Sequence, residues 1–488
     1  MRVYLLNPPY LPHFGRGMRW QDTGRGGTLY YPIWLSYATA LVEQAHETRL
    51  VDAPAWNWDR EAVITDVNRF KPDLIVIDSS FPSLQNDIDI AGALKKITGS
   101  CIVLVGPPAS QFPDEILDNN GIDIVARFEY DYTIKELADT VENGTKLAGV
   151  QGISYKENNG RIRHNPDRGF TASEDLDRIP FVSNVYKNHL NIEDYFLGSS
   201  LYPEVQIFTG RGCPYQCTFC SWPQTLMGRQ YRVRSIPNVL DELAWIEDNL
   251  PEVKEVFFED DTFTINRSLE KKNRVLAFCN EYKERGLNIT WACNARVGLD
   301  YETMRAMKRA HCRLVIVGYE SGSDEILKNI KKGITVEQIK RFAKDARAAG
   351  LLVHADFIIG LPGETKATIE ETRTLIRETR PELLQVAVAS PFPGTEFYTW
   401  CKANGYLTTD DPGGYLDEHG HQKAIVSYPL LSNEEITDAV DELLKQYYLS
   451  FRYVPLAVRQ VLRRNGLAEA RRLWHSAKMF MKYVRGRA

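Results

Sequence analysis

The chain contains 488 residues, more than a single ordinary core accommodates, so we expect two or three domains. Charged residues make up 25% and hydrophobic residues 43%, and the formal net charge of −5 gives no global reason to expect nucleic-acid binding. No apolar run reaches 18 residues, and the first residues do not form a signal peptide. The eight cysteines lack a disulfide pattern. We therefore expect an intracellular protein of the reducing cytoplasm.

Residues 1–145 alternate between short apolar segments and helical ones. The apolar segments predict strands at 3–6, 48–51, 74–77, 102–105 and 122–126. The segments between them predict helices at 34–44, 60–69, 87–97, 113–119 and 133–142. This order indicates an α/β domain with a parallel, doubly wound sheet, which binds its ligand beyond the carboxyl ends of the strands. No Gly-x-Gly-x-x-Gly follows the first strand, which argues against a dinucleotide.

The rest of the chain divides into three parts. Residues 146–200 are polar and turn-rich and predict a linker. Residues 201–400 return to alternating strands and helices, with strands at 204–209, 255–258, 290–294, 314–317, 353–359 and 384–388. Six such units predict a partial (β/α)6 barrel, whose reactive groups would lie at the carboxyl ends of its strands. Residues 401–488 predict a helical region.

The last 38 residues are strongly basic. Residues 451–488 contain ten Lys or Arg against one acid, Glu469, and large apolar side chains such as Phe451 and Trp474 lie among them. A basic amphipathic helix of this kind is typical of a membrane-surface element. A helical cap that packs its apolar stripe on the barrel fits the pattern equally well.

Three cysteines follow the first predicted barrel strand. Cys213, Cys217 and Cys220 lie on one short loop, with no fourth Cys or His within twenty residues. A structural zinc would need a distant fourth ligand, such as His189 or Cys279, and an electron-transfer cluster normally takes four protein ligands. Three thiolates on a [4Fe–4S] cluster instead leave one iron open to an outside molecule.

This cysteine loop resembles that of the radical S-adenosylmethionine (SAM) enzymes. In that superfamily the open iron chelates the methionine moiety of SAM, and electron transfer yields a 5′-deoxyadenosyl radical. The resemblance implies that Phe219, just before the third cysteine, contributes to the SAM site. Glu320 would accept bonds from the ribose hydroxyls, and the backbone of the segment with Gly360 and Pro362 would lie against adenine.

Charged residues follow the second and third barrel strands. Glu259 and Asp260 could accept hydrogen bonds from the α-amino group of SAM, or cap a helix in solvent. Arg296 could pair with the SAM carboxylate, or neutralise the nearby acids.

The N-terminal domain, placed before such a core, resembles the Rossmann-like domain of the cobalamin-binding radical SAM enzymes. The segments 31–38, 49–54 and 124–133 carry this resemblance. The last of them has Phe128 and Tyr130 where glycines are common, and resembles the subgroup with the hopanoid-biosynthesis ring-contraction enzyme. The implied cobalamin-binding residues are Pro9, Ser79, Ser80, Phe81, Gly106, Pro108 and Glu129. No Asp-x-His-x-x-Gly occurs, so no His of this domain should ligate cobalt. A flavodoxin-like domain with another ligand, or none, is the alternative.

The resemblance implies an enzyme with a [4Fe–4S] cluster, SAM and cobalamin as cofactors. We expect methylation of an unactivated carbon in a hydrophobic or natural-product substrate. One alternative is a radical rearrangement or ring contraction of a hopanoid-like lipid without methylation, and another is a non-catalytic iron–sulfur or cobalamin carrier. The expected partners are the small-molecule or lipid substrate and an electron donor of the flavodoxin or ferredoxin type, but no nucleic acid. The basic tail adds peripheral contact with the inner face of the membrane as one interpretation.

Overall fold

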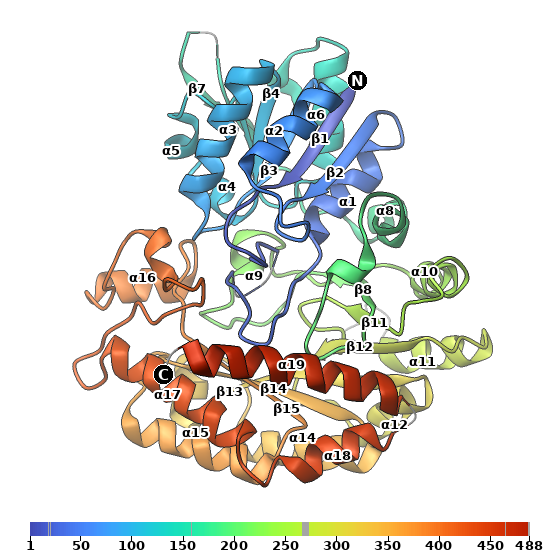
Figure 1. The fold of residues 1–488 in the computed structure, drawn as a ribbon, viewed down its shortest axis with the longest axis vertical. Helices are drawn as coiled ribbons and strands as arrows, with labels where there is room; N and C mark the ends of the chain where they lie inside the picture. The colour runs from blue at the N-terminus through green and yellow to red at the C-terminus, as the bar shows by residue number, and fades with distance from the viewer. Residues whose placement is uncertain (18, 20, 158, 266–272, 464, 487–488) are drawn as a thin grey trace.

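The computed structural model describes residues 1–486 except 18, 20, 158, 266–272 and 464. Arg464 and Arg487 of the basic tail therefore lie outside the described residues. An N-terminal domain stands above a barrel, and the long segment after the first strand descends between them (Figure 1). The C-terminal helices lie across the front of the barrel (Figure 1).

The N-terminal domain is built on a sheet that has seven strands within the described residues, in the order β2-β1-β3-β4-β5-β6-β7. The strands are β1 (Arg2–Asn7), β2 (Glu47–Asp52), β3 (Leu74–Asp78), β4 (Cys101–Val105), β5 (Ile124–Ala126), β6 (Ile153–Lys156) and β7 (Ile162–His164). Strands β1 to β5 run parallel, which confirms the doubly wound sheet.

Strands β6 and β7 come from the segment that the sequence predicts to be a linker. They pair antiparallel with β5 and with each other, so the sheet extends beyond residue 145. The physical reason is that strands of four and three residues, joined by a polar turn, carry too little apolar periodicity to be recognised. Other connecting elements are η1 (Leu147–Gly149), α7 (Ser173–Leu176), α8 (Val182–His189) and η2 (Ile192–Asp194).

Helices flank both faces of this sheet. They are α1 (Ile33–Val42), α2 (Arg60–Phe70), α3 (Leu84–Thr98), α4 (Pro107–Gln111), α5 (Pro113–Leu117) and α6 (Asp131–Glu142). Every residue of α1 is buried, because α6 and α8 pack on it and its aromatic side chains reach the barrel. Trp34 lies 5.1 Å from Phe208 and 5.9 Å from Trp222, between ring centroids. The two domains therefore share one hydrophobic core.

The barrel sheet has six parallel strands among the described residues, in the order β15-β14-β13-β12-β11-β8, which confirms the partial barrel. The strands are β8 (Glu204–Ile207), β11 (Glu255–Phe258), β12 (Thr290–Ala295), β13 (Cys312–Glu320), β14 (Leu352–Ile359) and β15 (Leu383–Val388). Their helices are α10 (Ile236–Asn249), α11 (Arg274–Glu284), α12 (Tyr301–Arg309), α13 (Asp324–Asn329), α14 (Val336–Ala349) and α15 (Lys366–Thr379). Between β8 and α10 lie β9 (Gly210–Arg211), α9 (Trp222–Thr225) and β10 (Arg232–Val233).

The C-terminal region is helical, as expected. It contains α16 (Glu396–Ala403), η3 (Pro412–Tyr415), α17 (Asn433–Tyr448), α18 (Val454–Val461) and α19 (Gly466–Gly486). Helix α19 is fastened to the barrel by buried charges: Glu469 pairs with Arg313 at 2.9 Å and with Arg472 at 2.9 Å. It therefore packs as a cap on the barrel. Within the described residues, no helix has the length and apolarity needed to span a bilayer.

Candidate active site

The cysteine loop lies between β9 and α9, at the barrel end that faces the N-terminal sheet. Cys217 is buried, and Cys213 and Cys220 are partly buried. Burial raises the pKa of Cys213 to about 12, and the carboxylate of Asp261 adds to this effect. The pKa of Cys220 is raised for the same two reasons. In the absence of metal, the thiols of Cys213 and Cys220 therefore hold their protons.

A tight backbone contact fixes the start of this loop. Gly212 has a φ of 84°, and a Cβ at this position would lie 2.1 Å from the carbonyl oxygen of Gln230. Only glycine combines this dihedral with this approach. The backbone amide of Cys213 donates to the carbonyl of Gly228 at 3.3 Å.

Each thiol has a cationic side chain within electrostatic range. The pairs are Cys220 with Arg19, Cys213 with Arg296, and Cys217 with Lys332. Within the described residues, no three His, Cys, Asp or Glu side chains converge on a single-ion site. In a [4Fe–4S] cluster each thiolate ligates a different iron, so three thiols that do not share one ion remain a suitable donor set. Three thiolates make such a cluster anionic, and the surrounding cations fit that charge.

The three acids after β11 have different partners. Asp260 accepts hydrogen bonds from the Thr209 amide at 2.6 Å, the Thr209 hydroxyl at 2.7 Å and the Tyr231 hydroxyl at 3.0 Å. It thereby joins the ends of β8 and β11. Glu259 pairs with Arg19, and Asp261 lies 3.4 Å from Arg19 and within range of the thiols. The sequence singles out Glu259 and Asp260, whereas the structure puts Asp260 in a bracing position and Asp261 beside the thiols.

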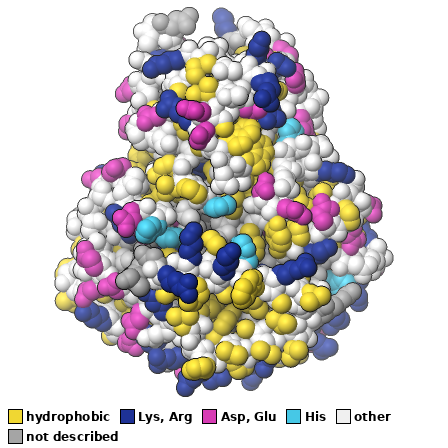
Figure 2. All heavy atoms as spheres, viewed as in Figure 1, with side chains coloured by type: hydrophobic (Ala, Val, Ile, Leu, Met, Phe, Trp, Pro, Cys, Tyr) yellow, Lys and Arg dark blue, Asp and Glu magenta, His cyan; other side chains and the backbone are white. Residues whose placement is uncertain are grey.

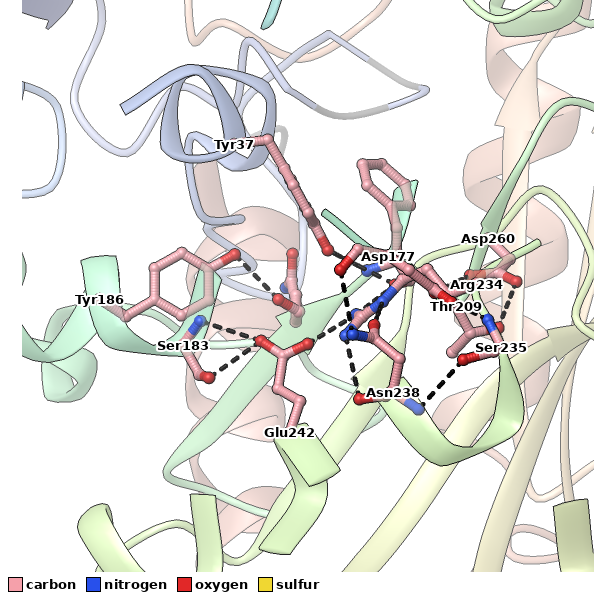
Figure 3. A network of polar contacts seen from close by, with 12 residues as sticks. Tyr37, Asp177, Ser183, Tyr186, Thr209, Arg234, Ser235, Asn238, Glu242 and Asp260 are labelled. Atoms are coloured by element: carbon pink, nitrogen blue, oxygen red, sulfur yellow. Dashed lines mark hydrogen bonds and ion pairs between the residues drawn. The ribbon is translucent and has the colours of Figure 1, made fainter. Parts of the chain in front are cut away.

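A polar network holds the residues that directly follow β8 (Figure 3). Arg234 pairs with Glu242 at 2.6 Å and donates to the Phe208 carbonyl at 2.9 Å. Tyr37 of the N-terminal domain accepts from the Phe208 amide at 2.8 Å. Glu242 accepts from Ser183 of α8 (Figure 3). The strand that carries the cysteine loop is thus held by both domains.

Arg296 and Glu320 meet at Lys332, which sequence reasoning missed. The Lys332 ammonium donates to Glu320 at 2.6 Å, and the backbone carbonyl of Lys332 accepts from Arg296. Arg296 also lies over the ring of Tyr215 in the cysteine loop, 3.7 Å from its centroid. Glu320 has a φ of 64°, a strained conformation for a non-glycine residue. The structure thus brings Arg296 and Glu320 together through a buried lysine beside Cys217.

The segment with Gly360 and Pro362 follows β14. Gly360 has a φ of 97°, and a Cβ there would lie 3.1 Å from Ile436 of α17. Its carbonyl accepts from Tyr428 at 2.7 Å, and that of Pro362 accepts from Asn329 at 3.0 Å. The close neighbour at Gly360 is therefore the side chain of Ile436, whereas the sequence predicts adenine next to this segment. Phe219 is partly buried and packs on the hydrophobic core.

The predicted cobalamin residues gather at the carboxyl edge of the N-terminal sheet. Gly106 has a φ of 101°, and a Cβ there would lie 2.1 Å from the carbonyl oxygen of Ser79. The hydroxyls of Ser80 and Ser83 share a hydrogen bond of 2.7 Å, and Pro108 lies in α4. Pro9 lines a cavity of about 400 Å³ beside α2 and α3.

Two of these residues, which the sequence predicts to bind cobalamin, contact side chains of the barrel. Phe81 stacks on Phe392, with ring centroids 5.5 Å apart. Glu129 pairs with Arg232 at 2.6 Å and holds the domains together.

Several buried polar atoms near this edge have no hydrogen-bond partner among the described residues. They are the hydroxyls of Ser79 and Tyr130 and the indole nitrogen of Trp34. Such groups are costly unless a ligand or water satisfies them. A large amphipathic ligand such as cobalamin fits an edge that combines these polar groups with aromatic side chains.

Comparison with known proteins agrees with this site. Residues 207–376 match the model of the Radical SAM superfamily, and residues 23–138 match that of the B12 binding domain. An uncharacterized methyltransferase from Pyrococcus horikoshii is 30% identical over 92% of this chain and 92% of its own length. The anaerobic magnesium-protoporphyrin IX monomethyl ester cyclase of Rubrivivax gelatinosus is 26% identical, over 82% of this chain and 69% of its own.

A solved structure shares the fold. The radical SAM methyltransferase TsrM from Kitasatospora setae, with cobalamin and a [4Fe–4S] cluster bound, superposes with a TM-score of 0.66 at 17% identity, over 91% of this chain and 88% of its own. The cofactors of the present chain are accordingly SAM, a [4Fe–4S] cluster and cobalamin. The chain belongs to the radical SAM enzymes that carry a B12-binding domain, a family that includes methyltransferases.

Proposed function

We propose that this enzyme methylates an unactivated carbon of a hydrophobic substrate. The observation that carries the proposal is the placement of the two cofactor sites. The cysteine loop and the carboxyl edge of the N-terminal sheet face each other across one shared interface, with α4 in contact with α9. The name of the Pyrococcus horikoshii relative supports methyl transfer.

The side chains around the cysteine loop have defined tasks in this proposal. When bound, the cluster supplies the electron that cleaves SAM, and cobalamin supplies the methyl group. Arg19, Arg296 and Lys332 offset the negative charge of the thiolates and orient anionic groups beside them. Glu320, fixed by Lys332, and Asp261 are the acceptors for the polar groups of SAM. Gln224 of α9 donates to the carbonyls of Cys220 at 2.7 Å and Thr218 at 3.2 Å, and so fixes the end of the loop.

A second candidate is radical chemistry without methyl transfer. A relative named as a cyclase, which is 26% identical over 82% of this chain, supports it. A ring contraction of a hopanoid-like lipid belongs to the same class.

The products of SAM distinguish these candidates. Anaerobically reconstituted protein is incubated with SAM, hydroxocobalamin, a strong reductant and extracted lipid, and mass spectrometry quantifies 5′-deoxyadenosine and S-adenosylhomocysteine. We expect both products in comparable amounts if methylation occurs. Deoxyadenosine without S-adenosylhomocysteine would replace the methylation proposal by the second candidate. Absence of both, with cluster and cobalamin bound, would leave only a carrier function.

We also propose that the C-terminal helices contact a membrane surface containing anionic lipid. Figure 2 shows hydrophobic side chains gathered on the lower front of the molecule, with Lys and Arg around them. Phe451 is 95% exposed and Trp474 is 76% exposed. Apolar side chains beside basic ones favour an anionic bilayer surface. An electron donor of the flavodoxin or ferredoxin type completes the proposed partners.

Removal of the two exposed aromatic side chains should weaken this contact. For the double variant Phe451→Ser/Trp474→Ser, we expect at least about tenfold weaker binding to vesicles with anionic lipid, because each burial contributes about 1.5–3 kcal/mol. Vesicle co-sedimentation is the measurement. The control is Ile97→Ser, which removes an apolar side chain, 45% exposed, from α3. Equal binding of both variants and the parent would contradict the proposal.

A further inference from the structure

A cavity of about 400 Å³ lies inside the barrel, beneath α19. Strands β13, β14 and β15 form one wall, Arg19 and the segment 22–30 form another, and α17 and α19 close the remaining side. Figure 1 shows α19 crossing in front of these strands. The cavity therefore depends on the cap formed by the C-terminal helices.

Most of the cavity wall is apolar. Ile316 and Val386 contribute from the strands, and Leu473 and Phe480 contribute from α19. Leu449, at the mouth, is 54% exposed. A cavity of this size, with a mostly apolar surface and polar side chains set into it, is the usual form of a small-molecule site.

Two polar side chains on one face of β14 point into this apolar space. His354 Nε2 lies 3.5 Å from Asp356 Oδ1. Neither His354 Nδ1 nor Asp356 Oδ1 has a hydrogen-bond partner among the described residues, although both atoms are buried. Burial lowers the pKa of His354 to about 3, so its imidazole is neutral at pH 7, and burial raises the pKa of Asp356 well above its ordinary value. They offer one hydrogen-bond donor or acceptor each to a ligand.

The arginines that border the cavity are already engaged within the protein. Arg19 pairs with Glu259 and Asp261. Arg472 pairs with Glu469 at 2.9 Å and donates to Gln460 at 2.7 Å. Arg25 donates to the Tyr483 hydroxyl at 2.9 Å. Asp22, a second carboxyl in the wall, is likewise engaged, because it lies within electrostatic range of Arg25 and accepts from the backbone of Gln422. A charged ligand would therefore lose its hydration in this cavity without gaining a dedicated counter-charge.

The cavity wall includes residues that also reach the surroundings of the cysteine loop. Arg19 lines the cavity and is also within electrostatic range of Cys220. Asn294 lines it too, and donates to the carbonyl of Asp260 at 2.9 Å. A molecule in the cavity would thus reach towards the site of SAM cleavage.

We propose that this cavity binds the substrate, and that the substrate is a neutral, mostly apolar molecule whose polar group bonds to His354 and Asp356. This inference rests on the proposed function and specifies its substrate class.

Binding of small probes to the full-length, anaerobically reconstituted enzyme tests the substrate class. Equilibrium dialysis compares 1-naphthalenemethanol with 1-naphthoate and 1-naphthylmethylammonium, which share the ring system but carry opposite charges. We expect the neutral alcohol to bind at least tenfold more tightly than either ion. The variant His354→Phe should remove the advantage of the alcohol over 1-methylnaphthalene, because the hydrogen bond is lost.

A matched pair of glycine variants tests the location. A Cβ at Gly26, which lines the cavity, meets no heavy atom within 4 Å, and the same holds at Gly169, which is exposed in a loop. We expect Gly26→Trp to weaken binding of the alcohol at least tenfold and Gly169→Trp to leave it unchanged. Thermal unfolding and bound cobalamin report whether both variants are folded.

Three results would overturn the proposal: no binding of the alcohol at millimolar concentration, equal or tighter binding of an ion, or full binding by folded Gly26→Trp. Deoxyadenosine formation is measured on the same preparations. If SAM is cleaved but the alcohol does not bind in the cavity, the substrate class fails alone. If the alcohol binds but SAM is not cleaved, the proposed function fails alone.

Discussion

Replacement of Cys217 by serine is expected to reduce formation of 5′-deoxyadenosine to background. The hydroxyl of serine is a much poorer ligand for iron than a thiolate, so one of three protein ligands is lost and the cluster becomes unstable. Iron and sulfide content should fall together with SAM cleavage, while cobalamin binding at the carboxyl edge of the N-terminal sheet should persist. Mass spectrometry of deoxyadenosine and chemical iron analysis are the measurements.

Cys101→Ser is the matched control. Cys101 is partly buried at the start of β4, in the N-terminal domain, and lies outside the cysteine loop. This variant should retain iron content and SAM cleavage within about twofold. If Cys217→Ser retained a full cluster and normal cleavage, the assignment of the three thiols would be wrong.

Replacement of Glu469 by alanine is expected to lower the free energy of unfolding by about 3–5 kcal/mol. Glu469 is the partner of two buried arginines, Arg313 and Arg472, whose side chains are 5% and 0% exposed. Without Glu469, both guanidinium groups would remain buried and would lack a carboxylate partner that they have in the parent. Because this cluster attaches α19 to the barrel, probe binding in the cavity beneath α19 should be lost as well. Denaturant unfolding and equilibrium dialysis are the measurements.

The control for this effect is Glu434→Ala. Glu434 is an exposed residue in the first turn of α17, where a charge contributes at most about 1 kcal/mol. A destabilisation by Glu469→Ala no larger than that of Glu434→Ala would contradict the anchoring role.

The same cluster predicts how stability depends on pH. Burial alone would raise the pKa of Glu469, but Arg313 and Arg472 outweigh it and hold the pKa below its ordinary value. Because the pKa is lower in the folded state, the stabilisation is present above about pH 4.3, the ordinary glutamate value, and decreases as the pH falls through the folded-state value. The difference in stability between the parent and Glu469→Ala should therefore shrink on acidification from pH 6 towards pH 3. A difference that grows on acidification would contradict this sign.

The fold could be predicted largely from local pattern. Strands such as β3 and β4 are apolar and separated by helices of ordinary length, and this order alone indicates parallel sheets. Pattern failed at β6 and β7, because strands this short are specified by pairing with β5 and not by their own sequence. For α19, the sequence left packing on the barrel and contact with a membrane surface as equal interpretations. Its basic surface is visible in the sequence, but the burial of Glu469 and Arg472 depends on their meeting Arg313 from β13.

The candidate site was predictable where a short motif carries the chemistry. The spacing of the three cysteines is such a motif. Arg19 and Lys332 were missed because each lies far from the cysteines in sequence and belongs to no motif, so only the fold brings them to the thiols. Three successive acids after β11 could not be told apart for the same reason. Their partners, among them Thr209 and Tyr231 for Asp260, come from other parts of the chain.

The central claim is that the three cysteines hold a cluster with one open iron, and the response of that cluster to SAM tests it most directly. Electron paramagnetic resonance spectra of the reduced, reconstituted enzyme are recorded with and without SAM. We predict a clear shift of the [4Fe–4S]⁺ signal when SAM is added, and no shift when the same buffer is added without SAM. A fully loaded, reduced cluster whose spectrum is unchanged by saturating SAM would mean that no iron is open, and would contradict the account.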